Sequence, residues 1–122
     1  MRLRFPKAVR LRRSSEFQHL KRHGVSVHGK LMVVSVAPIP SPHEPAAETR
    51  VGFITSRRVG GAVVRNLVRR RLRELVRLSR PGFPAGKWVV IIARQHAAKA
   101  SFEAMREEWN RLAQRAGLLS EA

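Results

Sequence analysis

The chain has 122 residues, of which 43% are apolar, and this is typical of one globular domain rather than a disordered chain. There is no cysteine, which excludes disulfides, cysteine-ligated metal centres and a thiol nucleophile. Lysine and arginine number 25 against 8 acidic residues, so the formal net charge is +17. Such a surplus of charge indicates a polyanionic partner. Nucleic acid is the first expectation and an anionic membrane surface is the alternative.

The first half of the chain predicts one helix and three strands. Residues 1–13 are expected to form a basic extended arm. Ser14 or Ser15 can cap a helix that runs to about Arg22, with an apolar stripe formed by Phe17, Leu20 and Val25. Strands are predicted at 26–28, 31–39 and 51–56, where β-branched residues are frequent. A proline-rich loop at 40–48 joins two of these strands inside a single domain that spans 1–122.

The second half predicts a long helix, a strand and a final helix. A helical period begins after Gly60 and Gly61 and continues to about Leu78. The continuous apolar run at 87–94 predicts a strand buried on both faces. Ser101 can cap a last helix that Gly117 ends, and both tryptophans are assigned to the core. The order α-β-β-β-α-β-α predicts an α+β sandwich with helices over a mainly four-stranded sheet.

The long helix is strongly basic on one side. Segment 56–80 contains nine arginines and one acidic residue. A helical wheel predicts that the core side carries Val64, Leu67, Val68, Leu72, Leu75 and Leu78. The opposite side carries Arg65, Asn66, Arg69, Arg73 and Arg77, with Arg70 at its margin. Arg71 falls in the apolar sector and is expected to extend along the packed edge.

This arrangement of arginines indicates an anionic ligand. Like charges four residues apart destabilise an isolated helix, and they recur here along one face. The guanidinium group suits phosphate because it can donate two parallel hydrogen bonds. A solvated helix in an arginine-rich protein is the alternative. It explains the choice of arginine over lysine but not the scarcity of acidic residues.

No self-sufficient active site is visible in the sequence. The five histidines are scattered, aspartate is absent, and no spacing indicates a metal site or a serine nucleophile elbow. Gly60 and Gly61 precede a helix but lack the rest of a phosphate-binding loop motif. We therefore expect neither catalytic residues nor a metal ion bound by the protein itself.

Residues 50–75, RVGFITSRRVGGAVVRNLVRRRLREL, resemble the signature of the protein subunit of bacterial ribonuclease P. The similarity extends over nearly the whole chain. It includes the Ser-x-x-Phe opening of the first helix, the His-Gly that follows this helix, and the strand that ends in Ile-Ala-Arg.

The resemblance implies both a fold and a function. The implied fold contains a left-handed βαβ crossover, whereas the general rule predicts a right-handed one. The implied function is that of a cytoplasmic protein cofactor, with no obligate protein partner and no membrane association. It would bind a catalytic RNA, which holds the Mg²⁺ ions and cleaves precursor tRNA, and it would contact the 5′ leader of that tRNA. The alternative is a basic ribosomal or ribosome-assembly protein with no nuclease role.

The resemblance also assigns residues. Five residues of the long helix match the RNA-binding motif, namely Arg65, Asn66, Arg69, Arg70 and Arg73, and the preceding turn matches through Ser56, Arg57 and Arg58. Phe17 matches an aromatic residue that lines the leader cleft. The chain departs from the family pattern at two positions. Leu67 replaces the second arginine of Arg-Asn-Arg, and Lys21 replaces a second cleft aromatic.

Overall fold

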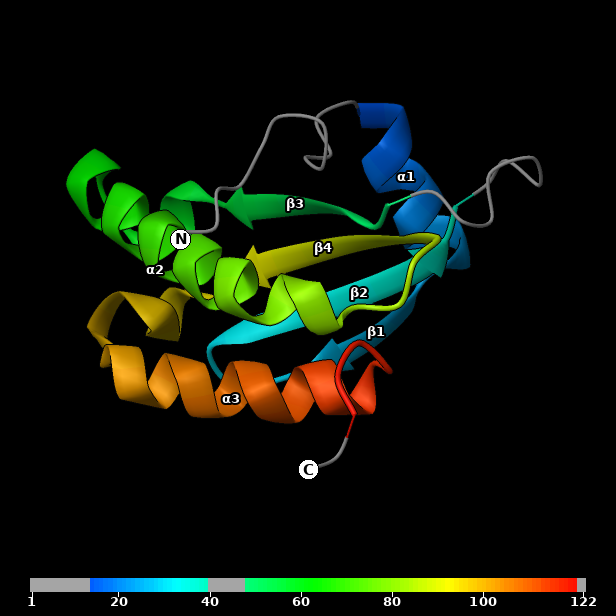
Figure 1. Ribbon diagram of the computed structural model, residues 1–122. Helices are drawn as coiled ribbons and strands as arrows, with labels where there is room; N and C mark the ends of the chain where they lie inside the picture. The colour runs from blue at the N-terminus through cyan, green and yellow to red at the C-terminus, as the bar shows by residue number, and fades with distance from the viewer. Residues whose placement is uncertain (1–13, 40–47, 121–122) are drawn as a thin grey trace.

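The computed structural model describes residues 14–39 and 48–120 (Figure 1). Its helices are α1 (Ser14–His23), α2 (Ala62–Ser79) and α3 (Phe102–Arg115). Its strands are β1 (Val25–His28), β2 (Met32–Pro38), β3 (Arg50–Thr55) and β4 (Lys87–Ala93). Three short 3₁₀ turns are η2 (Arg57–Val59), η3 (Arg80–Gly82) and η4 (Gln95–Lys99). The predicted order of helices and strands is confirmed. The expected arm at 1–13 and nearly all of the loop at 40–48 lie outside the described residues.

The four strands form one mixed sheet in the order β1-β2-β4-β3. The first two pairings are antiparallel, and β3 pairs with β4 in parallel. Helix α2 connects these parallel strands. In Figure 1, α2 lies in front of the sheet, both strands run from right to left, and β4 lies below β3. The connection is therefore left-handed, against the general preference.

The two faces of the sheet are covered unequally. Helices α2 and α3 cover one face, and α1 lies at one end of the other (Figure 1). The α2/α3 face holds the main core, which includes Met32, Ile91, Leu72, Met105 and Trp109. The α1 face holds a small cluster of Leu20, Ala37 and Val90, edged by half-buried aromatic and aliphatic side chains. Most of the burial that stabilises the fold therefore lies on the α2/α3 side.

Helix α3 matches its prediction closely. The Ser101 hydroxyl caps it by accepting a hydrogen bond from the Ala104 amide at 3.1 Å. Gly117 follows with a φ of 80°, a left-handed conformation that favours glycine. Trp109 is fully buried, and its indole donates to the Ser79 hydroxyl at 2.9 Å. This hydrogen bond connects α3 to the end of α2 and satisfies the one polar atom of the tryptophan.

The helical wheel of α2 is correct at its centre and wrong at its edges. Val68, Leu72 and Leu75 are buried as predicted, but Leu67 is 40% exposed and Leu78 is 57% exposed. Val76, which the prediction left out, is buried instead. The helix is thus rotated so that its side bearing Leu67 faces solvent. Arg71 behaves as expected, since its guanidinium donates to the Ala100 carbonyl at 3.0 Å.

Two assignments on the α1 side are wrong. Val25 is 70% exposed on the outer strand β1 and does not continue the apolar stripe of α1. Trp88 is half-buried beside the α1 cluster, whereas Trp109 alone lies in the main core. Strand β4 therefore has one fully covered face and one that is only partly covered. The reason is that α1 spans only part of this side of the sheet.

Candidate nucleic-acid interface

Helix α2 carries Arg69 and Arg73 on the flank that faces β3. Arg69 donates to the Thr55 hydroxyl at 3.3 Å and to the Asn66 side chain at 3.2 Å. The Arg73 guanidinium lies 5.9 Å from the centroid of the Phe53 ring. These contacts with β3 hold the guanidinium groups in place while leaving them partly accessible. The flank is therefore a positioned array of positive charge rather than a set of free side chains.

The other predicted residues of this helix differ in exposure. Asn66 and Arg70 are both exposed. The helical wheel placed Arg70 at the margin of the basic side, but in the structure it lies on the solvent-facing side. Arg65 is half-buried, and its Nε atom has no hydrogen-bond partner among the described residues. Arg77 is bound by Glu74 at 2.5 Å, and this hydrogen bond raises the pKa of Arg77 above its ordinary value. Arg77 is therefore already partnered within the protein.

The turn between β3 and α2 presents the remaining predicted residues. Ser56, Arg57 and Arg58 are all exposed, and the next residue, Val59, is buried. Amides of Val59 and Gly60 close the turn η2 onto the carbonyls of Ser56 and Arg57, respectively. Gly60 has a φ of 152°, which few other residues adopt, and an added Cβ would lie 3.0 Å from Val64. The turn thus continues the basic surface from α2 to the end of the sheet.

A groove of about 420 Å³ runs between α1 and the uncovered part of the sheet. Phe17 and Lys21 line it from α1, together with Leu20 and Gln18. Its floor comes from all four strands, through Ser26, His28, Val33, Ser35, Ile54, Val90 and Ile92. The floor is mainly aliphatic, and two serine hydroxyls bond to each other within it at 2.6 Å. The structure therefore brings the two predicted cleft residues together in one groove.

Helix α1 is held over the sheet on the side away from the groove. Glu16 is buried and forms an ion pair with Arg50 at 2.7 Å, which connects α1 to β3. His19 donates from Nε2 to the Pro38 carbonyl at 3.2 Å and packs edge-on against Trp88. These contacts fix the orientation of α1. Phe17, one position after Glu16, and Lys21, two positions after His19, line the groove.

One buried carboxylate was missed by the sequence reasoning. Glu108 is 5% exposed, and its two oxygens accept hydrogen bonds from the backbone amides of Lys30, Leu31 and Met32 at 2.8–2.9 Å. A Cβ on Gly29 would lie only 2.5 Å from this carboxyl group. Glu108 occupies the apolar side of α3, three residues after Met105, and that position was the available signal.

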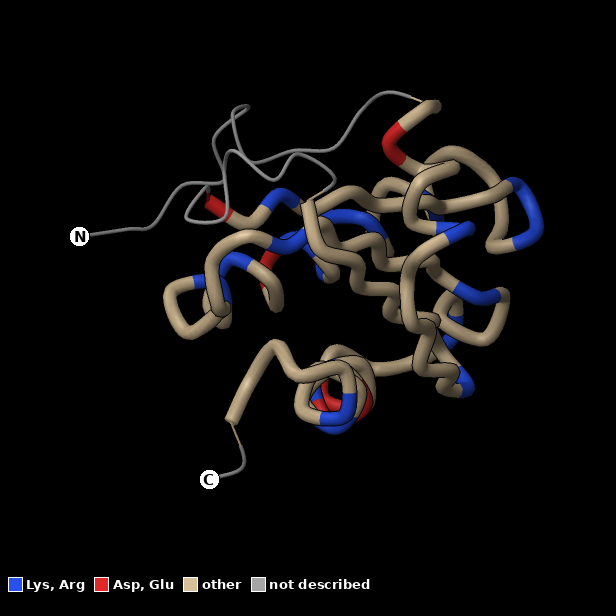
Figure 2. The backbone as a smooth tube through the Cα atoms, turned by 90° about the vertical axis from the view of Figure 1, so that its right-hand side faces the viewer, with Lys and Arg blue, Asp and Glu red and all other residues tan. Residues whose placement is uncertain are grey.

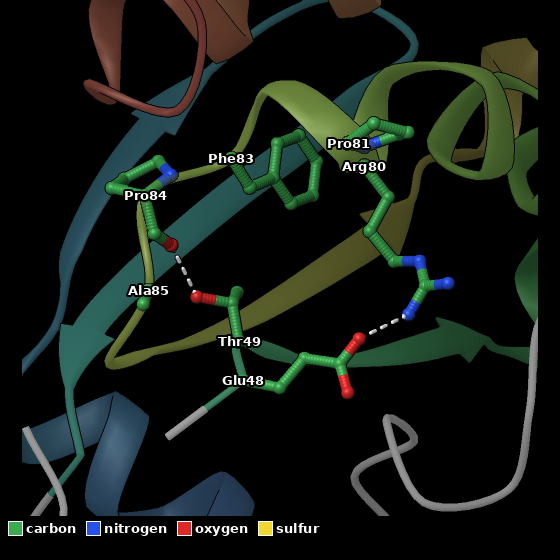
Figure 3. A pocket seen from close by; sticks show the side chains of 7 residues that line it. All are labelled: Glu48, Thr49, Arg80, Pro81, Phe83, Pro84 and Ala85. Atoms are coloured by element: carbon green, nitrogen blue, oxygen red, sulfur yellow. Dashed lines mark hydrogen bonds and ion pairs between the residues drawn. The ribbon is translucent and has the colours of Figure 1, made fainter. Parts of the chain in front are cut away.

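A separate hollow of about 370 Å³ lies at the end of the sheet where β3 and β4 begin (Figure 3). Thr49 donates to the Pro84 carbonyl at 2.5 Å and accepts from the Lys87 amide at 3.2 Å. Across the hollow, Arg80 forms an ion pair with Glu48 at 2.9 Å. These contacts fasten the segment before β4 onto the start of β3. Thr49, Glu48 and Arg80 therefore already have partners within the protein, and these contacts stabilise the fold.

Acidic residues are concentrated on α3. Figure 2 shows this helix end-on with positions of both signs, while most coloured positions elsewhere are basic. Glu103 and Glu108 on α3 each have an arginine three residues further along the same helix within 4 Å. Among the described residues no group of three His, Cys, Asp or Glu side chains is placed to hold a metal ion. In the same part of the chain, no helix is long and apolar enough to cross a membrane.

Comparison with known proteins identifies the family. A family model described as ribonuclease P matches residues 5–117. The chain belongs to the ribonuclease P protein family. A ribonuclease P protein component from Symbiobacterium thermophilum is 42% identical over 113 residues, which cover 93% of this chain and 95% of that one. The corresponding protein from Acidothermus cellulolyticus is 42% identical over 107 residues, covering 88% and 87%.

Solved structures of ribonuclease P proteins share the fold. A Staphylococcus aureus RNase P protein mutant with defective mRNA degradation activity superposes with a TM-score of 0.82 at 25% identity, covering 93% of this chain and 92% of that one. The Thermotoga maritima RNase P protein gives 0.73 at 26% identity, covering 87% and 96%. The single mixed α+β domain is thus the architecture of the ribonuclease P family.

The structure places both departures from the family pattern. Leu67, at the position of an expected arginine, lies exposed on α2, so the surface there is apolar where charge was expected. Lys21, at the position of an expected aromatic residue, lines the groove one turn after Phe17. The α1 wall of the groove therefore combines the aromatic ring of Phe17 with the positive charge of Lys21.

Proposed function

We propose that the chain is the protein cofactor of a ribonuclease P ribonucleoprotein. In this proposal the α2 flank and the turn at Ser56–Arg58 bind the catalytic RNA, and the groove binds the 5′ leader of precursor tRNA. The RNA carries out the hydrolysis with Mg²⁺ ions that it binds itself, and the assembly acts in the cytoplasm. The observation that carries the proposal is that strand β3 separates these two surfaces. Its Thr55 contacts Arg69, and its Ile54 lies in the groove floor.

The groove has the chemistry that single-stranded RNA requires. Bases stack on aromatic rings and lie against aliphatic surface, and Phe17 and the sheet floor supply both. Lys21 adds a positive charge at the wall for the backbone phosphate. A leader that has been separated from its complement exposes base faces and phosphates together. The groove therefore suits a leader strand better than it suits a duplex.

The α2 flank suits structured RNA. Its guanidinium groups are held in place by Thr55, Asn66 and Phe53, so less side-chain freedom is lost when phosphate binds. Exposed Arg57, Arg58 and Arg70 extend the charge around the start of the helix. Arg65, Arg69 and Arg73 are half-buried, so the flank is partly open to a large partner.

Reconstitution tests the proposal. The purified protein should restore cleavage of a precursor tRNA by a bacterial ribonuclease P RNA at a low Mg²⁺ concentration at which the RNA alone is inactive. A matched basic ribosomal protein, added at the same concentration, controls for unspecific charge neutralisation. If both proteins stimulate equally, or neither does, the cofactor role is wrong. In that case a ribosomal or ribosome-assembly role becomes the better explanation of the basic surface.

A further inference from the structure

A second concentration of positive charge lies outside the α2 flank and the groove. It surrounds an open hollow of about 550 Å³ between the β1–β2 turn, η4 and α3. Four basic side chains line it, namely Lys30, His96, Lys99 and Arg111, and we call them the strand-end patch. Lys30 comes from the β1–β2 turn, far in the sequence from the η4 and α3 segments that carry the other three. The fold therefore assembles the patch, and no single run of charge in the chain creates it.

Among the residues that the structure describes, the one carboxylate lining this hollow is already engaged. Glu108 lines the hollow, but its oxygens accept the three backbone amides of the β1–β2 turn. Arg111 approaches Glu108 only to 3.6 Å. Lys30 and Lys99 are exposed, and no ion pair to either side chain occurs among the described residues. The patch thus keeps a surplus of positive charge that its own surroundings do not neutralise.

The turn that carries Lys30 is fixed from two sides. Glu108 binds its amides from α3, and the Arg94 guanidinium donates to the Gly29 carbonyl at 3.1 Å from the end of β4. An added Cβ at Gly29 would collide with the Glu108 carboxyl group, so the turn packs tightly against α3. Lys30 therefore projects from a rigid base. Such preorganisation favours binding of an anion because less freedom is lost.

The position of the patch indicates its partner. Turn η4, which carries His96 and Lys99, lies between α2 and α3 at the end of the sheet where β4 ends (Figure 1). The exposed Arg57 and Arg58 of η2 lie at the same end of the sheet, after β3. A phosphate backbone bound along the start of α2 therefore needs only to continue around this end to reach the patch. An acidic protein is the other class of partner with suitable charge, but this continuity with the α2 surface favours RNA.

We propose that the strand-end patch is a second phosphate-binding surface for the backbone of structured RNA. This inference rests on the proposed function, since it extends the same RNA interface. Within the patch, Lys30 and Lys99 are the principal phosphate contacts, and His96 and Arg111 are its secondary members. The bound phosphates belong either to the catalytic RNA or to the precursor tRNA, and the chemistry is the same for both.

The test measures the dependence of affinity on salt. Lys30→Ala and Lys99→Ala are compared with the unsubstituted protein in binding to ribonuclease P RNA over a range of salt concentrations. Log affinity falls as log salt rises, and each substitution should make this line less steep by about 1, because one phosphate contact is lost. Lys87→Ala is the matched control, since Lys87 lies at the other end of β4 and outside both surfaces. Lys30→Arg and Lys99→Arg should retain the original slope, and the melting temperature should not change.

A second arm identifies the source of the phosphates. If the slope changes on assembly with the catalytic RNA, the phosphates are those of that RNA. If it changes only when precursor tRNA binds the assembled holoenzyme, they are those of the tRNA. If the unsubstituted protein binds RNA and both alanine variants keep its slope in both arms, the patch is not an RNA surface. If the unsubstituted protein does not bind the catalytic RNA, the proposed function itself is wrong.

Discussion

Phe17 and Lys21 are adjacent on one face of α1, yet they should act through different forces. Both line the groove, and each is separated from the main core by the sheet. A stacked base gains free energy from the ring face, which dissolved salt hardly affects. A phosphate next to lysine releases a counterion, so its contribution falls as salt rises. The two residues can therefore be told apart by one titration.

Phe17→Ala should reduce affinity for a leader-bearing precursor tRNA by about 1–3 kcal/mol at any salt concentration. Lys21→Ala should instead make the plot of log affinity against log salt less steep by about 0.7. The measurement is binding to the assembled holoenzyme, with mature tRNA lacking a leader as the control substrate. Equal loss for both substrates, or a lowered melting temperature alone, would assign Phe17 to the core rather than to the leader.

Glu108 should contribute strongly to stability. Glu108→Gln keeps the shape of the side chain but replaces one accepting oxygen with an NH₂ group, which cannot accept a hydrogen bond from a backbone N–H. We expect the free energy of unfolding to fall by about 1–3 kcal/mol, as for a buried hydrogen bond left unmade. Denaturant unfolding measures this change. Glu103→Gln on the exposed face of the same helix is the control, and an equal loss in both variants would contradict the role of Glu108.

At the scale of the element, α2 packs on one side against the core, and we propose that its arginine-bearing side binds RNA. Leu72→Ala opens a cavity in the core and should lower the free energy of unfolding by about 2–5 kcal/mol. Leu67→Ala on the exposed side should change it by no more than about 0.5 kcal/mol. Arg65→Ala, Arg69→Ala and Arg73→Ala should each weaken binding to the catalytic RNA by about 1–3 kcal/mol. Unfolding curves of these variants check the predicted changes in stability, and RNA titrations check the predicted changes in affinity. Arginine variants that unfold the protein but bind normally would show that this flank is structural.

The positions of helices and strands along the chain were predicted better than the side of each helix that faces the core. Apolar period and capping residues located all three helices, and β-branched runs located all four strands. A helical wheel cannot fix the direction of the core to better than one side-chain position, because the sheet decides which flank is covered. That is why Leu67 and Leu78 proved exposed and Val76 buried. Glu108 escaped notice for a related reason, since its partners are backbone amides that carry no signature in the sequence.

The candidate site likewise has residues that the sequence predicted and residues that only the structure brings together. The helical wheel indicated the α2 arginines, the resemblance to a family added Phe17 and Lys21, and the structure places these last two in one groove. The floor of that groove comes from four strands and could not be read from local pattern. The strand-end patch is further still from prediction, because Lys30, Lys99 and Arg111 meet only after the sheet and α3 have packed.

At the scale of the whole molecule, we expect the protein to cleave no RNA by itself. The described residues contain no group of three metal-binding side chains, and the chain has neither cysteine nor aspartate. Purified protein, treated exhaustively with nuclease and freed of RNA, is incubated with precursor tRNA and Mg²⁺. The leader should stay attached until the catalytic RNA is added. Leader removal by the RNA-free protein would place catalytic groups on the polypeptide and overturn this division of labour.

The hand of the β3-α2-β4 connection decides which side of the sheet remains open. With the same strand order, a right-handed connection would carry α2 to the side of α1. The helix would then lie over Ile54 and Ile92, which now form part of the groove floor. Helix α3 would be left to cover the opposite side alone. The unusual winding of one segment thus makes room for a ligand on a small sheet, and any redesign that reversed it would close the groove while preserving every strand.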